Sequence, residues 1–127
     1  MKRLLVVDDA LLMRKMICEV AREAGWDVAG EARNGAEAVE LYSRLRPDLV
    51  TMDVVMPEMG GLEALRRIRA VDPDAQVVMI TAVDQKQTLL ESIRAGAIDF
   101  IVKPFERQRV LGLLAKLGAA PSRSAPG

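Results

Sequence analysis

The 127-residue sequence has no histidine, one cysteine and very few aromatic residues, with one Trp, one Tyr and two Phe. The lack of histidine excludes catalysis that depends on an imidazole base and every metal site that uses histidine ligands. The single thiol, Cys18, excludes an internal disulfide and a cysteine metal cluster. We interpret Cys18 as a buried structural residue in a helix, in keeping with a reducing cytoplasm.

The sequence also lacks an excess of charge and a long apolar run. Its 18 basic and 18 acidic residues cancel, which argues against direct nucleic acid binding through charge. At the amino terminus, Lys2-Arg3 precedes only a short apolar run that ends at two aspartates. We therefore expect neither a signal peptide nor insertion into a membrane.

Half of the residues are hydrophobic, and the chain is long enough to bury one core of ordinary size. After Leu117 the composition changes to Gly, Ala, Pro, Ser and Arg, which cannot form a packed face. The sequence therefore predicts a folded domain at residues 1–118 and a flexible tail at residues 119–127.

The spacing of apolar residues changes repeatedly along the chain and predicts alternating strands and helices. Nearly continuous apolar runs are typical of parallel strands that are buried on both faces. The predicted strands are 3–8, 27–32, 48–53, 75–81 and 97–103. The predicted helical faces are Leu12, Met16 and Val20; Ala38, Leu41, Tyr42 and Leu45; Leu62, Leu65 and Ile68; Leu89, Leu90 and Ile93; and Val110, Leu113, Leu114 and Leu117. This order predicts an α/β fold, a three-layer doubly wound structure with a five-stranded parallel sheet and five helices.

Three aspartates stand where two of the predicted strands end. Asp8 and Asp9 follow the first strand, and Asp53 ends the third. Three like charges in a partly desolvated cleft repel one another, so they need a bound cation, or one of them must stay protonated. Oxygen ligands without His or Cys favour a hard divalent ion such as Mg²⁺.

Two further polar groups follow the remaining strands of the predicted sheet. Thr81 ends the fourth strand, and Lys103-Pro104 ends the fifth. A hydroxyl and an ammonium at neighbouring strand ends suit a phosphoryl group that sits on one of the carboxylates. Taken singly, Thr81 could equally cap the next helix, and Lys103 could be an ordinary solvated charge.

Together, these strand-end segments resemble the receiver domain of two-component response regulators. The segments are Val7-Asp8-Asp9, Asp53 with Met56-Pro57, Thr81-Ala82, and Phe100 through Lys103-Pro104-Phe105. The resemblance extends to about Leu117 and is greatest to the single-domain chemotaxis regulators of that family. It implies a flavodoxin-like sheet with strand order 2-1-3-4-5.

The resemblance also implies a role for each acidic residue. Asp53 matches the phosphoacceptor, which takes a phosphoryl group from a phosphohistidine of a histidine kinase. Asp9, Asp53 and the backbone carbonyl of Val55 are then expected to hold Mg²⁺, with Asp8 acting through a water molecule. Mn²⁺ is expected to substitute for Mg²⁺.

The same resemblance assigns the switch residues. Thr81 and Lys103 are expected to contact the phosphoryl oxygens, and Phe100 matches the aromatic residue that turns inward when the Thr81 loop moves. The Lys103-Pro104 bond is expected to be cis. The protein is thus expected to be a phosphoacceptor switch with self-catalysed phosphorylation and dephosphorylation, not an enzyme that releases a product.

The implied output surface is the fourth helix, fifth strand and fifth helix, at about 87–117. In a chemotaxis regulator this surface would bind the flagellar motor switch protein, and the chain would be a cytoplasmic monomer. The alternative is a receiver domain of a longer regulator, for example a transcriptional one, in which the same face would control an effector domain or dimerisation.

Two other protein classes fit less well. A phosphatase of the dehalogenase type would need a second Asp at the position of Val55, where it acts as general acid. A flavodoxin-like electron carrier would need a phosphate loop rich in Ser, Thr and Gly after the first strand, but Asp8-Asp9-Ala10 would repel a flavin phosphate.

Val55 and Val83 stand where chemotaxis regulators often carry polar residues that position water. Without a side-chain acceptor there, a hydrolytic water is harder to orient. The sequence therefore predicts a long-lived phosphoryl aspartate.

Overall fold

The computed structural model describes residues 2–119, in which strands and helices alternate as predicted. The elements are β1 (Arg3–Val7), α1 (Leu11–Glu23), β2 (Asp27–Ala32), α2 (Gly35–Leu45), β3 (Leu49–Asp53), α3 (Gly61–Val71), β4 (Val77–Ala82), α4 (Lys86–Arg94), β5 (Asp99–Lys103) and α5 (Arg107–Ala119). The five parallel strands have the order β2-β1-β3-β4-β5. The predicted fold class is confirmed. Of the predicted tail, Ala119 is the last residue of α5, and 120–127 lie outside the described residues.

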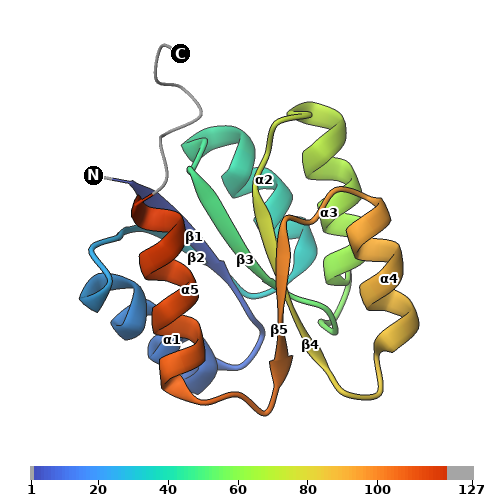
Figure 1. Cartoon of the computed structure of the whole chain (residues 1–127). Helices are drawn as coiled ribbons and strands as arrows, with labels where there is room; N and C mark the ends of the chain where they lie inside the picture. The colour runs from blue at the N-terminus through green and yellow to red at the C-terminus, as the bar shows by residue number, and fades with distance from the viewer. Residues whose placement is uncertain (1, 120–127) are drawn as a thin grey trace.

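The sheet lies between two layers of helices (Figure 1). Helices α1 and α5 cover one face, while α2, α3 and α4 cover the other. Each face has its own hydrophobic cluster: Ile17, Val20 and Leu114 belong to the first, and Tyr42 and Leu65 to the second. Because both faces are covered, nearly all of the residues of β1 and β3 are buried.

The register of the strands brings their carboxyl ends to one edge of the sheet, the lower edge in Figure 1. Val7 pairs with Met52 on β3, and Asp53 pairs with Ile80 on β4. Asp8 therefore emerges beside Asp53, and Thr81 lies one position beyond Ile80. Polar residues that are far apart in the sequence thus share one edge.

Two of the predicted helical faces are wrong in part. The single buried residue of α4 is Ser92, whereas Leu90 and Ile93 are 41% and 46% exposed. Helix α4 contacts α3 and β4 and is the last helix of its layer, which leaves these apolar side chains with little to cover them. Leu12 is 83% exposed because it belongs to the first turn of α1, at the edge of the sheet.

At the opposite edge of the sheet, the start of β2 is tied to α5. The Trp26 side chain is buried, and its Nε1–H donates to the Leu114 carbonyl at 2.8 Å. Trp26 directly precedes β2, so it lies at the amino-terminal edge, away from the aspartates. Cys18 is buried between α1 and the sheet, as predicted.

Within residues 2–119, the structure has no helix with the length and apolar character needed to span a membrane.

Candidate functional site

The three predicted aspartates meet at the carboxyl edge of the sheet. Carboxylate oxygens of Asp8, Asp9 and Asp53 all lie within 4.8 Å of one another. Asp8 and Asp53 are buried, whereas Asp9 is exposed to solvent. A cluster of this kind has one open side, through which an ion or a phosphoryl group could approach.

Asp8 is held in place by its own loop. Its Oδ1 accepts a hydrogen bond from the Ala10 N–H at 2.9 Å, which turns the chain from β1 into α1. The Asp8 carbonyl accepts a hydrogen bond from Nη1 of Arg14, also at 2.9 Å. Both the side chain and the backbone of Asp8 are therefore fixed.

Lys103, the last residue of β5, partly neutralises the acidic cluster. Its Nζ lies 3.2 Å from Oδ1 of Asp53 and 3.4 Å from Oδ2 of Asp8. The bond from Lys103 to Pro104 is cis, as expected. One ammonium faces three carboxylates, so the cluster keeps an excess of negative charge, which a divalent cation would offset.

Burial and the neighbouring charges in this cluster shift the pKa values of two groups. Burial, followed by the negative charge of Asp8, raises the pKa of Asp53 to about 6, although Lys103 acts in the opposite direction. For Lys103, burial lowers the pKa, but the charges of Asp53 and Asp8 outweigh burial and raise it above its usual value. Ionisation of Asp53 is therefore less favourable than that of an ordinary aspartate.

This pKa predicts how the stability of the metal-free protein depends on pH. The Asp53 pKa is raised in the folded state, so its contribution to stability is complete below its unfolded pKa of about 4 and is lost as the pH rises through about 6. The Asp53→Asn variant lacks this titration. We therefore compare the free energy of unfolding of the variant with that of the parent. After allowance for solvent screening, we expect this difference to shift in favour of the variant by on the order of 1–2 kcal/mol as the pH rises from 4.5 to 7.5. Urea unfolding at both pH values checks this, and a constant difference would contradict it.

Thr81 and Phe100 lie on the neighbouring strands but do not contact the carboxylates. The Thr81 side chain is buried, and its hydroxyl donates to the Ala82 carbonyl at 3.3 Å. Phe100 is partly buried and packs against the cluster beneath α2 and α3. Strand β5 pairs Ala82 with Lys103, so the Thr81 loop and Lys103 are adjacent.

The loop after Asp53 passes directly over the end of β3. The Gly61 N–H donates to the Val54 carbonyl at 2.8 Å, and Gly60 precedes the first turn of α3. Gly60 is the N-cap of α3, and Gly61 is its first residue. Val55, whose carbonyl was predicted to bind the ion, has a side chain that points largely into solvent, with 61% of the residue exposed.

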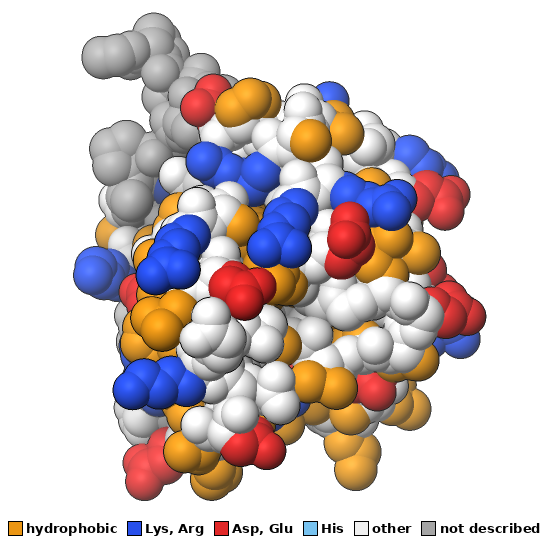
Figure 2. Space-filling view, turned by 90° about the vertical axis from the view of Figure 1, so that its right-hand side faces the viewer, with side chains coloured by type: hydrophobic (Ala, Val, Ile, Leu, Met, Phe, Trp, Pro, Cys, Tyr) orange, Lys and Arg blue, Asp and Glu red, His pale blue; other side chains and the backbone are white. Residues whose placement is uncertain are grey.

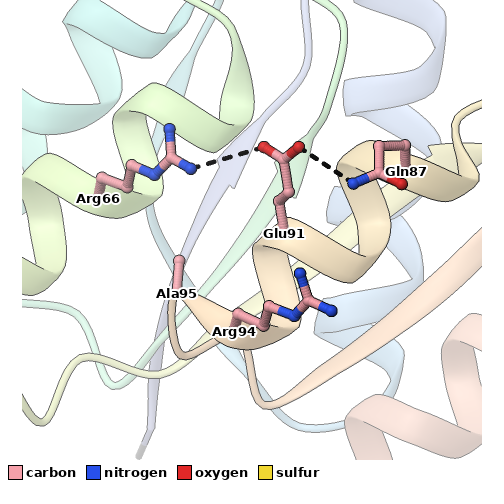
Figure 3. Close-up of a pocket in the computed structure, with 5 residues that line it drawn as sticks. All are labelled: Arg66, Gln87, Glu91, Arg94 and Ala95. Atoms are coloured by element: carbon pink, nitrogen blue, oxygen red, sulfur yellow. Dashed lines mark hydrogen bonds and ion pairs between the residues drawn. The ribbon is translucent and has the colours of Figure 1, made fainter.

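The described residues form several grooves besides the acidic cluster. The first lies between α3 and α4, where Glu91 accepts from Gln87 at 3.3 Å and faces Arg66 at 3.5 Å (Figure 3). The Arg66–Glu91 ion pair ties α4 to α3, whereas the Gln87–Glu91 hydrogen bond lies within α4. Figure 2 shows that basic side chains on the face turned to the viewer alternate with acidic ones and do not form a continuous basic patch.

The second groove is apolar and opens beside Lys103. Its volume is about 330 Å³, and its lining consists of Met13, Met16, Lys103, Pro104 and Phe105. It joins the first turns of α1 to the loop between β5 and α5. An apolar surface next to a charged site is typical of a place where another protein docks.

Sequence reasoning missed Arg14. Only 8% of this residue is exposed, and it lies on the same face of α1 as the buried Ile17 and Cys18. A basic residue at helical spacing from apolar neighbours was the available signal, because a charge on a buried face needs partners.

An acidic cluster with a lysine, at the carboxyl edge of a 2-1-3-4-5 sheet, is the arrangement that the resemblance to receiver domains predicts. Residues 4–115 match the family model of the response regulator receiver domain. The chain belongs to this family.

Its relatives include chemotaxis regulators. The chain is 51% identical over 116 residues to the chemotaxis protein CheY of Thermotoga maritima, covering 91% of the chain and 97% of the relative. A solved structure of the CheX-CheY-BeF₃-Mg²⁺ complex from Borrelia burgdorferi is similar, with a TM-score of 0.86, 32% identity and coverage of 94% and 90%. The response regulator domain of Thermotoga maritima CheB has a TM-score of 0.84, 35% identity and coverage of 98% of both chains.

The donor set of the acidic cluster fits a Mg²⁺ site. Only oxygen ligands are present, they come from residues that the fold holds close together, and the buried carboxylates carry more negative charge than Lys103 offsets. These are the properties that a hard divalent cation requires.

Proposed function

We propose that this protein is a chemotaxis response regulator whose phosphoacceptor is Asp53. The observation that carries this proposal is the acidic cluster, in which Asp53 lies beside Asp8, Asp9 and Lys103 at the carboxyl edge of the sheet. Family membership and the CheY relatives support the same role.

The proposed reaction is transfer of a phosphoryl group from a phosphohistidine of a histidine kinase to Asp53. A carboxylate oxygen of Asp53 forms a bond to phosphorus, the P–N bond breaks, and its electron pair stays on the imidazole, which takes up a proton. When bound, Mg²⁺ or Mn²⁺ would offset the negative charge that gathers in this step. Asp9, Asp53 and the Val55 carbonyl would hold the ion, and Asp8 would act through water. Dephosphorylation by water would follow slowly, catalysed by the same residues.

The surrounding residues would convert the new charge into a change of shape. Lys103, already 3.2 Å from Asp53, would pair with a phosphoryl oxygen. The Thr81 hydroxyl would give up its 3.3 Å contact with the Ala82 carbonyl and donate to another phosphoryl oxygen. Phe100 and the Lys103-Pro104 segment would follow the movement of the Thr81 loop.

The apolar groove beside Lys103 gives the kinase a place to dock. Leu11 and Leu12 are 53% and 83% exposed and extend this surface at the start of α1. A helical phosphodonor that covers them would bury apolar area while bringing its phosphohistidine to the open side of the cluster. Since such a donor is made from ATP, we place this exchange in the cytoplasm.

The proposed output surface is formed by α4, β5 and α5. Exposed apolar residues mark it, including Leu90, Ile93, Ile98 and Val102. In a chemotaxis regulator, this surface of the monomer would bind the flagellar motor switch protein. The similarity to the CheB domain keeps a second candidate open, in which the receiver domain belongs to a longer regulator and the same face controls an effector domain or dimerisation.

The decisive experiment is intact-mass measurement after incubation with acetyl phosphate. We expect one phosphoryl adduct that requires both Mg²⁺ and Asp53, and none in the Asp53→Asn variant. Absence of an adduct under every condition would refute the phosphoacceptor role. A pull-down with and without the beryllofluoride mimic then separates the two output candidates, since motor switch protein is recovered in one case and a second copy in the other.

The phosphoryl group should be long-lived, because the two positions that could orient water carry exposed valines. Val55 is 61% and Val83 is 72% exposed, and neither can accept a hydrogen bond from water. We expect Val55→Asn and Val83→Glu together to accelerate first-order loss of the adduct by roughly tenfold. Mass spectrometry over time gives the rate. Unchanged or slower decay in both single variants would show that water access is not controlled there.

A further inference from the structure

Arg14 is a buried charge next to the acidic cluster, and nothing in the phosphoryl transfer described above uses it. Only 8% of the residue is exposed. Its Nη1 donates to the Asp8 carbonyl at 2.9 Å, and its Nε donates to Oε1 of Glu31 on β2 at 3.2 Å. Burying a guanidinium is costly unless its donors are used, so these contacts account for its position.

The contact with Asp8 acts on the peptide that joins two of the three acidic residues. The Asp8 carbonyl belongs to the planar peptide unit between Asp8 and Asp9. Fixing this carbonyl fixes the direction in which the chain continues to Asp9. The Asp8 side chain is already held by the Ala10 N–H and by Lys103, whereas Asp9 is exposed.

We propose that Arg14 is a positioning residue for the divalent cation. It holds the Asp8–Asp9 peptide so that both carboxylates face the same ion, and Glu31 in turn holds the guanidinium. This inference rests on the proposed function, because it assumes that the acidic cluster binds Mg²⁺. It also links the cation site to α1, the helix that carries Met13 and Met16 of the apolar groove.

If Arg14 positions the aspartates, its loss should weaken Mg²⁺ binding. If it acts only as a positive charge, its loss should strengthen Mg²⁺ binding. A positive charge near the site repels a cation, so removing it would tighten Mg²⁺ binding. Loss of positioning would weaken binding instead. Because Arg14 is paired with Glu31 at 3.2 Å, the carboxylate offsets part of its charge, and we expect positioning to dominate.

The test is the dissociation constant for Mg²⁺, measured by isothermal titration calorimetry on the full chain. Arg14→Lys keeps the charge, but a single ammonium cannot reproduce the two bonds of the guanidinium fork. We expect binding about tenfold weaker than in the parent, the usual scale for a residue that orients a metal ligand. Arg22→Lys, at an exposed position of the same helix, is the matched control and should bind as the parent does.

Comparison with Ca²⁺ separates loss of positioning from simple destabilisation of the fold, which would not change the affinity for Mg²⁺ relative to that for Ca²⁺. Mg²⁺ needs nearly ideal octahedral geometry, while Ca²⁺ tolerates irregular sites. Loosening the Asp8–Asp9 peptide should therefore reduce affinity for Mg²⁺ more than affinity for Ca²⁺. An equal loss for both ions would overturn the proposal, and so would Mg²⁺ binding within twofold of the parent or tighter than in the parent.

Two further measurements keep the result unambiguous. Glu31→Gln changes a half-exposed residue and leaves the Arg14 bond to Asp8 possible, so it should fold even if Arg14→Lys does not. We expect it to weaken Mg²⁺ binding by about threefold, again more than Ca²⁺ binding; unchanged binding refutes the proposal. If the parent itself binds no Mg²⁺, both the proposed function and the inference about Arg14 fail. If the parent binds Mg²⁺ and the variants bind it equally well, only the inference about Arg14 fails.

Discussion

The Lys103→Met variant should accept a phosphoryl group from acetyl phosphate about 10²–10³-fold more slowly than the parent at saturating Mg²⁺. In the described structure, the Lys103 ammonium is the cationic group that contacts both Asp53 and Asp8, at 3.2 and 3.4 Å. Phosphoryl transfer gathers further negative charge at this point. Without the ammonium, the bound cation alone would offset that charge beside Asp8 and Asp53.

The rate of adduct formation, followed by intact mass at pH 7.5, measures this effect. Lys116→Met removes an exposed lysine of α5 and should leave the rate unchanged. Lys103→Arg should recover part of the rate, because it restores the charge but not the compact shape of an ammonium. A Lys103→Met rate within threefold of the parent would mean that this lysine does not act in the transfer step.

Gly61→Ala should destabilise the fold by about 3 kcal/mol or more. A Cβ atom at Gly61 would lie 2.2 Å from the Asp53 carbonyl oxygen and 3.0 Å from its carbonyl carbon. These are backbone atoms of β3, so they cannot turn aside as a side chain could. Relief requires movement of the strand end that carries the phosphoacceptor or of the first turn of α3.

Urea unfolding compares this variant with Gly112→Ala, which makes the same substitution within α5. A Cβ atom at Gly112 would meet no atom within 4 Å, and Ala favours the helix, so this control should gain about 0.5–1 kcal/mol. Opposite signs for the two substitutions are the expected result. If Gly61→Ala is as stable as the parent, the close approach of α3 to Asp53 is not a constraint on the fold.

The sheet could be predicted from the sequence because its strands are buried along nearly their whole length and therefore appear as continuous apolar runs. Four successive residues of β1, Leu4 to Val7, have no exposed surface at all, and such a run can hardly be anything but a strand covered on both faces. The positions of Asp8, Asp53 and Lys103 then followed, because the ends of parallel strands share an edge. Their chemical roles remain predictions that await the experiments above.

Periodicity was less informative where a helix is not fully covered. In α4 the sequence could not reveal that Ser92 turns inward, with its hydroxyl donating to the Thr88 carbonyl at 2.8 Å, while Leu90 and Ile93 stay exposed. Arg14 was missed because its burial depends on the Asp8 carbonyl, just after β1, and on the Glu31 carboxylate in β2. The helical spacing of Arg14 from apolar neighbours indicates only that the residue is buried, because its partners are set by tertiary packing.

Trp26 gives the protein a fluorescent reporter that is separate from its signalling edge. It is the only tryptophan in the sequence, and its hydrogen bond to Leu114 lies at the end of the sheet that the aspartates do not occupy. Its emission should therefore follow unfolding of the whole domain and stay nearly constant when an ion or phosphoryl group binds. Any ligand of the acidic edge can then be quantified by how far it displaces the unfolding midpoint, without correction for a direct spectral change.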